Sequence, residues 1–108
     1  MAYNSAFKIA AIATLIMGVT GSAHAIDPNR AAELDNLVRQ DCGSCHGLTM
    51  KGGLGPALLP ENVKESDEEA LAYIILHGVP DTPMPPWAVE ITPDEARWIV
   101  QRLKEGLK

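Results

Sequence analysis

Apolar residues recur at helical spacing in three stretches of the chain, and each stretch predicts an amphipathic α-helix. The first helix is expected from about Pro28 to residues 42–46, with Asp27 as its N-cap and Pro28 at the first helical position. Its apolar side chains fall on one face: Leu34, Leu37, Val38 and Cys42. This face leads directly into the two cysteines of the chain.

The other two helices carry clear start signals. Ser66-Asp67-Glu68-Glu69 predicts a capping box and a helix that begins at Ser66 and ends at Gly78. The residues expected to share one face of this helix are Ala70, Tyr73, Ile74 and His77. Thr92-Pro93-Asp94-Glu95 predicts a second capping box, with proline at the first helical position. The apolar stripe that follows it comprises Ala96, Ile99, Val100, Leu103 and Leu107.

Long loops are expected between these helices. Residues Gly47–Pro60 and Val79–Ile91 lack a helical period and are rich in glycine and proline. The sequence shows no strand pattern and no internal repeat. It therefore predicts an all-α fold of about three helices joined by long loops.

The first 25 residues have the pattern of a secretory signal peptide. Lys8 precedes an apolar run, Ile9–Val19, and the small-residue sequence Ala23-His24-Ala25 is typical of a cleavage site. The run would form about 16 Å of helix, against a hydrocarbon core of about 30 Å, so a retained membrane anchor is the weaker alternative. We expect residues 1–25 to be a signal peptide and residues 26–108 to be one domain exported to the bacterial periplasm.

The charge of the expected mature domain limits its partners. Residues 26–108 contain eight basic and fourteen acidic side chains, a formal charge of −6. This charge argues against nucleic acids and anionic membranes as partners and favours a positive patch on another protein. The domain is also short and holds only three aromatic side chains, Tyr73, Trp87 and Trp98, so its own core is small.

Cys42-Gly43-Ser44-Cys45-His46 has the spacing of a c-type haem attachment site. On a helical turn both sulfurs face the same way, where they can form thioethers to one edge of a porphyrin, and His46 is then delivered to the iron. A redox disulfide would normally open a helix in a βαβ unit, and a zinc site would need a second pair of ligands. We therefore expect one covalent haem c, which would also enlarge the small core.

Three side chains are candidates for the second axial ligand of the iron. Met50 lies only four residues beyond His46, which favours a packing role, and His77 is placed to cap the end of a helix. Met84 lies 38 residues after His46, between Pro83 and Pro85. A methionine and a histidine form the usual electron-transfer pair, and flanking prolines would fix the position of Met84, so it is the favoured candidate.

These motifs resemble the small bacterial class I cytochromes c. The resemblance rests on the haem motif with Gly47, on Gly55-Pro56-Ala57-Leu58, and on Met84-Pro85-Pro86. It covers nearly all of residues 26–108 and implies the class I fold around one covalent haem. It also implies that the Pro56 carbonyl accepts the proton on the far nitrogen of His46, which would fix the ring and strengthen its donation to iron.

Residues 46–61, with DTPMPPW and EARWIVQRL, are similar to the NirC-type cytochromes of nitrite reductase gene clusters in denitrifying bacteria. This similarity implies a periplasmic electron carrier with a single haem, and we expect the protein to be a monomer. Its implied partners are the periplasmic nitrite reductase or the factors that mature its d-type haem. The wider class I pattern has an aromatic residue on the last helix where this chain has Arg102. Trp98, one turn earlier, is expected to take over the contact with the first helix or to face solvent.

Two classes of function remain after this reading. The leading hypothesis is a one-electron carrier and not an enzyme, with haem bound to Cys42 and Cys45 and iron bound by His46 and Met84. Trp87 is expected either to donate a hydrogen bond to a haem propionate or to pack in its loop. The alternative is a gas-binding protein or enzyme with an open sixth position, which would require Met84 to be off the iron.

Overall fold

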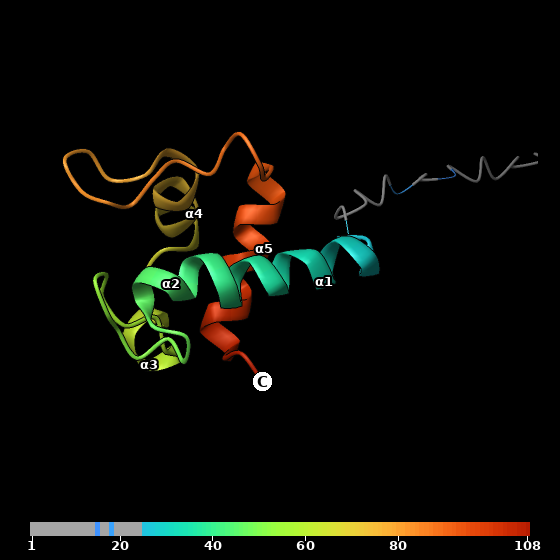
Figure 1. Ribbon diagram of the computed structural model, residues 1–108. Helices are drawn as coiled ribbons and strands as arrows, with labels where there is room; N and C mark the ends of the chain where they lie inside the picture. Colours follow the sequence, from blue (N-terminus) through green and yellow to red (C-terminus); the bar gives the residue numbers. More distant parts are fainter. Residues whose placement is uncertain (1–14, 16–17, 19–24) are drawn as a thin grey trace, which may run out of the picture.

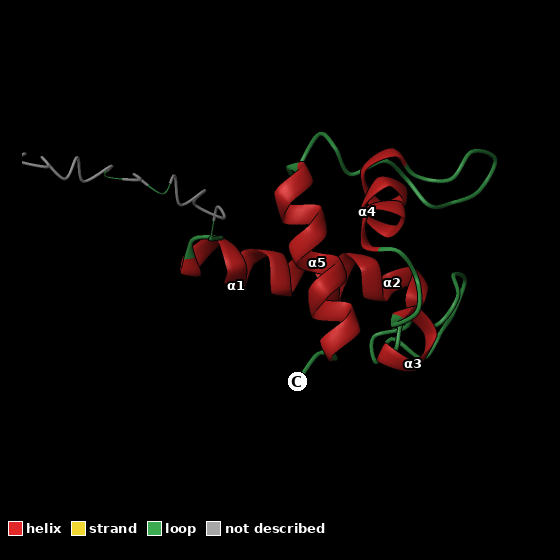
Figure 2. Ribbon diagram, turned by 180° about the vertical axis from the view of Figure 1, so that it is seen from behind, coloured by secondary structure: helices red, strands yellow, loops and turns green. Residues whose placement is uncertain are grey.

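A computed structural model describes residue 15, residue 18 and residues 25–108 of the chain. Within this part the chain forms helices and loops and no strands, which confirms the all-α prediction (Figures 1 and 2). The elements are α1 (Pro28–Leu37), the π-helical segment η1 (Val38–Cys42), α2 (Gly43–His46), α3 (Pro60–Val63), α4 (Glu68–His77) and α5 (Pro93–Glu105). Most of the expected signal peptide, residues 1–25, lies outside the described residues. None of the described helices is both long and apolar enough to cross a bilayer.

The first helix begins as predicted and continues without a break into the cysteine motif (Figure 1). Asp27 caps it, because its carboxylate accepts from the backbone N–H groups of Asn29 at 2.9 Å and Arg30 at 3.3 Å. The π-helical segment η1 was not predicted. A π turn is wider and rotates the chain less per residue than an α turn. Cys42, the last residue of this segment, is partly buried and packs against the core.

The predicted start of α4 at Ser66 is wrong. Asp67 is the N-cap, and its carboxylate accepts from the backbone N–H of Ala70 at 2.8 Å. Ser66 belongs instead to the turn after α3, since its N–H donates to the Val63 carbonyl at 3.1 Å. The Ser66 carbonyl also accepts from Lys104 Nζ at 2.5 Å, which ties that turn to α5. The end of α4 at Gly78 is as predicted.

The buried side of α4 is not the face singled out from the sequence. Ala72 and Leu76 are buried in the core, with α4 packed against α5. The expected shared face is exposed, with Tyr73 at 64% and Ile74 at 40% relative exposure. The rings of Tyr73 and His77 lie on this outer face with centroids 4.2 Å apart.

The last helix confirms both its predicted cap and its predicted stripe. Glu95 N–H donates to Thr92 Oγ1 at 3.2 Å, and Thr92 N–H donates to Glu95 Oε1 at 3.0 Å. Glu95 is buried and also pairs with the Arg30 guanidinium on α1, which holds the pKa of this carboxyl below its usual range. The buried residues of the stripe are Ala96, Ile99, Val100 and Leu103, and Leu107 is partly buried.

Arg102 joins the first and last helices by an ion pair. Its guanidinium donates to Asp35 on α1 at 3.0 Å and lies 5.7 Å from the centroid of the Trp98 ring. Arg39 also donates to Asp35, at 2.7 Å, and these arginines hold the pKa of Asp35 below its usual value. Trp98 is half-buried against the core. The contact expected from an aromatic residue is thus made by a charge pair, with Trp98 beneath the Arg102 guanidinium.

The loops follow the prediction with one exception. Val79–Ile91 contains no helix, whereas the predicted loop Gly47–Pro60 ends in the unpredicted helix α3, whose first residue is Pro60. Val63 of α3 is buried in the core, and α3 packs against α5. The short helix α3 therefore contributes to the core next to the loop that follows the cysteine motif (Figure 1).

Candidate haem-binding site

The continuous first helix places the whole cysteine motif at one end of the molecule. Cys42 ends η1, and Cys45 and His46 lie in α2. Both thiols are free and half-buried. Burial, with a smaller contribution from the charge of Asp41, raises the pKa of Cys42 to about 11. The Cys42 side chain packs against the hydrophobic core.

The His46 imidazole is fixed through its Nδ1 atom. Nδ1 lies 2.7 Å from the Pro56 carbonyl oxygen. A carbonyl can only accept, so Nδ1 must carry the proton and donate it. The lone pair is then on Nε2, the nitrogen left to bind a metal, and the Pro56 bond orients the ring for it.

The glycine-rich loop is shaped around the end of α2. Gly55 N–H donates to the Cys45 carbonyl and Gly52 N–H to the His46 carbonyl, both at 2.8 Å. A Cβ atom on Gly55 would lie 2.7 Å from Cε1 and 2.8 Å from Nδ1 of His46. Gly55 is thus required by the position of the ring. The sequence contained the Gly-Pro signal, but it gave Gly55 no role.

Gly55→Ala is expected to displace the His46 ring, because the added methyl group overlaps it. The variant should accumulate as holoprotein at several-fold lower yield, with lower thermal stability and an altered Soret spectrum. The matched control is Gly43→Ala, since a Cβ there meets its nearest atoms at an ordinary 3.4 Å. Equal yields, stabilities and spectra for the two variants would show that the close approach at Gly55 does not matter.

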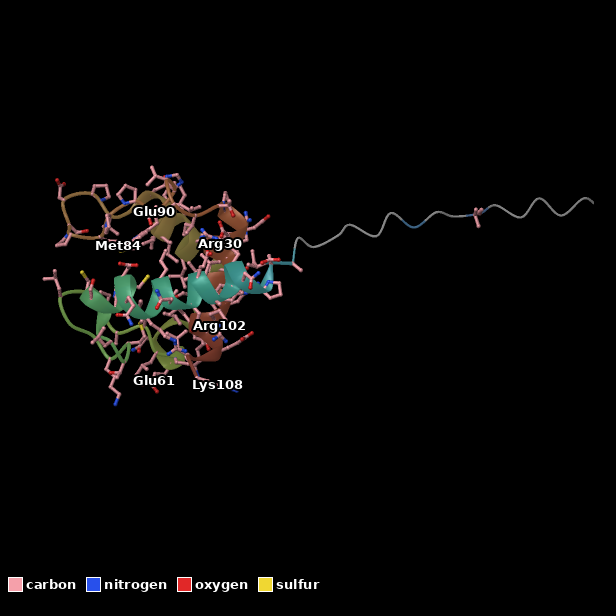
Figure 3. All side chains as sticks on the ribbon, turned by 45° about the vertical axis from the view of Figure 1, so that its right-hand side comes forward. Arg30, Glu61, Met84, Glu90, Arg102 and Lys108 are labelled. Atoms are coloured by element: carbon pink, nitrogen blue, oxygen red, sulfur yellow. The ribbon has the colours of Figure 1, made fainter. Side chains whose placement is uncertain are left out.

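Met84 lies in the loop between α4 and α5 and is half-buried. This loop and α2 occupy the same end of the molecule (Figures 1 and 3). Thus the structure brings all four expected site residues, Cys42, Cys45, His46 and Met84, to one end of the fold.

The other candidate ligands have different surroundings. Met50 is 3% exposed, belongs to the core, and lies beside Gly43. His77 is exposed, and its ring lies against that of Tyr73 with the two planes tilted by 43°. Trp87 is half-buried against the core, and its backbone N–H donates to the Ile75 carbonyl at 3.0 Å. Burial in the core accounts for Met50, whereas His77 lies on the exposed face of α4 beside Tyr73.

The donor set fits a c-type haem better than a bare metal ion. Two thiols and an imidazole with a free Nε2 meet the needs of covalent attachment and proximal ligation. No group of three or more histidine, cysteine, aspartate or glutamate side chains in the described part of the chain could hold a metal ion. Within residues 25–108, a zinc site would therefore have too few protein ligands.

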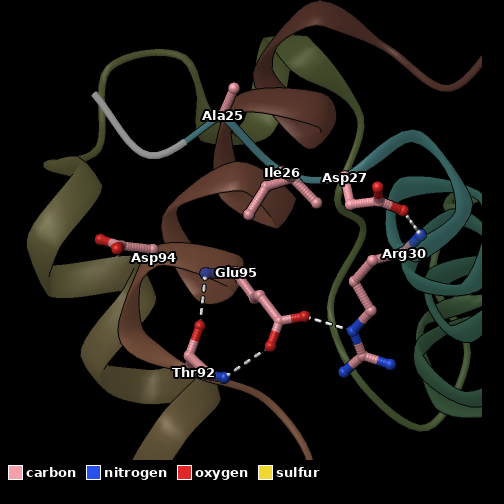
Figure 4. A pocket seen from close by; sticks show the side chains of 7 residues that line it. All are labelled: Ala25, Ile26, Asp27, Arg30, Thr92, Asp94 and Glu95. Atoms are coloured by element: carbon pink, nitrogen blue, oxygen red, sulfur yellow. Dashed lines mark hydrogen bonds and ion pairs between the residues drawn. The ribbon is translucent and has the colours of Figure 1, made fainter. Parts of the chain in front are cut away.

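A separate cavity of about 340 Å³ lies at the starts of α1 and α5 (Figure 4). It is lined by Ala25, Ile26, Asp27, Arg30, Thr92, Asp94 and Glu95. Its central charged groups are already engaged, because Glu95 pairs with Arg30 and accepts from Thr92 (Figure 4). These contacts join two helix ends, so the cavity is a structural junction rather than the haem site.

Comparisons with known proteins agree with this site. Residues 29–101 match the family described as cytochrome c oxidase, cbb3-type, subunit III. A cytochrome c55X of Pseudomonas aeruginosa is 54% identical over 80 residues, which cover 74% of this chain and 67% of the relative. The solved structure of a c-type cytochrome NirC is 53% identical with a TM-score of 0.71, and the match covers 73% of this chain and 93% of that one.

A larger protein contains a similar domain. The dihydro-heme d1 dehydrogenase of Pseudomonas aeruginosa is 39% identical over 70 residues, or 65% of this chain and only 14% of the dehydrogenase. This chain therefore corresponds to a small part of that protein. Together these matches establish the class I cytochrome c fold and a covalently bound c-type haem with its iron. The chain belongs to the NirC-type small cytochromes c.

Proposed function

We propose that this cytochrome is a periplasmic one-electron carrier whose haem is held by Cys42 and Cys45 and whose iron is ligated by His46 and Met84. The observation that carries the proposal is the 2.7 Å contact between His46 Nδ1 and the Pro56 carbonyl. It orients the imidazole and leaves Nε2 for the iron. When bound, the haem supplies a one-electron couple, and the chain sets its potential and its access to solvent.

Each axial side chain has a distinct task in this proposal. His46, hydrogen-bonded to Pro56, is the stronger electron donor of the pair. The Met84 thioether favours the reduced iron and raises the potential. With both axial positions filled, no substrate would reach the metal, so the chain needs no catalytic acid, base or nucleophile. This is the reason to favour a carrier over an enzyme or gas-binding protein with an open sixth position.

The periplasmic address rests on the sequence. The expected signal peptide, residues 1–25, would direct export, and residues 26–108 would form the mature monohaem domain. The mature charge of −6 favours a transient partner with a positive docking surface. We infer that the mature protein is a monomer.

Two places in denitrification fit such a carrier. In the first, the cytochrome donates electrons to the periplasmic nitrite reductase. In the second, it serves maturation of the d-type haem of that reductase. The similarity to a domain of dihydro-heme d1 dehydrogenase supports the second role. A dehydrogenation releases two electrons and two protons, so two oxidised carriers would each accept one electron.

The test follows the oxidation state of the purified holocytochrome by absorbance. The reduced protein is mixed with nitrite reductase, and nitrite is then added; rapid oxidation that requires both enzyme and nitrite is expected of a donor. In a parallel arm the oxidised protein is mixed with the dehydrogenase and dihydro-haem d1, where reduction is expected of a maturation partner. If neither arm changes the oxidation state and the reduced protein binds carbon monoxide readily, the open-site alternative replaces the carrier.

A further inference from the structure

The chain before Met84 forms a small loop that backbone hydrogen bonds close into a ring. Val79 N–H donates to the Met84 carbonyl at 3.2 Å, and Thr82 N–H donates to the Val79 carbonyl at 3.3 Å. Asp81, between them, has a positive φ of 61°. This is a left-handed conformation that aspartate tolerates in turns. The segment 79–84 is therefore a tight loop closed by its own backbone, and Met84 is its last residue.

The Thr82 hydroxyl bridges the inside of this ring. Thr82 Oγ1 donates to the Val79 carbonyl at 2.7 Å and accepts from the Met84 N–H at 3.3 Å. A hydroxyl can donate and accept at the same time. Both backbone polar groups of Met84 are thus held, the carbonyl by Val79 and the N–H by Thr82. Among the described residues, Thr82 provides the one side chain that hydrogen-bonds to Met84.

The ends of the loop are fixed by α4. Trp87 N–H donates to the Ile75 carbonyl at 3.0 Å and Ala88 N–H to the Leu76 carbonyl at 3.1 Å. At the other end Gly78 has a φ of 68°, and a Cβ there would lie 2.6 Å from the Met84 carbonyl oxygen. These contacts hold the loop against the helix. The conformation between the two ends depends on the ring and its hydroxyl bridge.

We propose that Thr82 is a positioning residue for Met84. By holding the backbone of Met84, Thr82 keeps the Met84 thioether at the sixth position of the iron, where the thioether outcompetes other ligands. This rests on the proposed ligation of iron by Met84. A thioether is a neutral ligand tethered to the protein, so the fraction of iron that it occupies depends on its effective concentration at the metal. An ordered loop keeps that concentration high, and a loosened loop lets an external ligand take its place.

The experiment compares Thr82→Val with Thr82→Ser in the ferric holoprotein, with imidazole as the competing ligand. Valine keeps the shape of threonine and removes the hydroxyl, whereas serine retains the hydroxyl. Thr82→Val is expected to bind imidazole about 3- to 10-fold more tightly, as the loss of one or two hydrogen bonds implies. The Met84 amide should also exchange its hydrogen several-fold faster. Thr82→Ser should stay near the wild type in both measurements.

Thr49→Val is the matched control, because Thr49 is an exposed threonine in the loop after α2 with no side-chain hydrogen bond in the described structure. It should leave imidazole affinity and Met84 exchange unchanged. If Met84→Ala strengthens imidazole binding while Thr82→Val does not, the ligand assignment stands and the role of Thr82 is wrong. If Met84→Ala also leaves imidazole binding unchanged, the ligand assignment itself fails and the role of Thr82 fails with it.

Discussion

Replacing both Cys42 and Cys45 with serine is expected to abolish covalent haem attachment. A serine hydroxyl cannot form the thioether that each thiol provides, and the small core of the domain then lacks its largest apolar component. Each single serine variant should retain one thioether. Acid–acetone extraction should remove all haem from the double variant and none from the wild type. Far-UV circular dichroism of the double variant should show a large loss of helix.

Ser44→Ala provides the control within the same motif. The Ser44 hydroxyl is exposed, and its partners among the described residues are the Asp41 carbonyl at 2.7 Å and the neighbouring Cys45 sulfur at 3.8 Å. This variant should keep its haem on the polypeptide through extraction. Release of haem from the wild type by the same treatment would show that attachment is not covalent.

If Met84 ligates the iron as proposed, Met84→Ala is expected to convert the proposed carrier into a ligand-binding protein. Loss of the thioether removes its preference for the reduced iron, so the reduction potential should fall by roughly 0.1 V or more, within the roughly 0.8 V that axial ligands and surroundings span. The weak far-red sulfur-to-iron charge-transfer band of the ferric protein should disappear. Carbon monoxide and cyanide should then bind to the metal.

Met50→Ala separates ligation from packing. Met50 is buried in the core, so its truncation should cost about 2–5 kcal/mol of stability while the far-red band and the potential stay close to those of the wild type. Survival of the band in Met84→Ala, together with its loss in Met50→Ala, would reverse the ligand assignment.

The sequence predicted a helix well where its cap and its buried face depend on interactions between residues close together in the chain. The Thr92 cap and the apolar stripe of α5 depend on residues close in sequence, and both appear as expected. The start of α4 was wrong by two residues because Ser66 and Asp67 are both good caps. The Ser66 N–H bonds to the Val63 carbonyl in the preceding turn, and its carbonyl accepts from Lys104, which lies 38 residues later in the chain. A start signal alone cannot contain that information.

The cysteine motif pointed to its chemistry, but the supports of the site could not be read from it. The fit of Gly55 against His46 and the bridge from Thr82 to Met84 depend on loop conformations without a periodic pattern. The π-helical segment η1 likewise has no distinct signal, since its residues read as an ordinary amphipathic helix. Patterns therefore identified the groups expected to hold the haem, and three-dimensional structure was needed to identify what orients them.

The ion pair between Asp35 and Arg102 makes part of the contact between the first and last helices sensitive to salt. Both side chains are about a quarter exposed, at 27% and 29%, so dissolved ions can screen their attraction. An aromatic side chain at the same crossing would be held by exclusion from water, which salt does not weaken. The part of the α1–α5 contact that this ion pair supplies should therefore weaken as the ionic strength rises, while the apolar contacts of Leu34 and Ile99 persist.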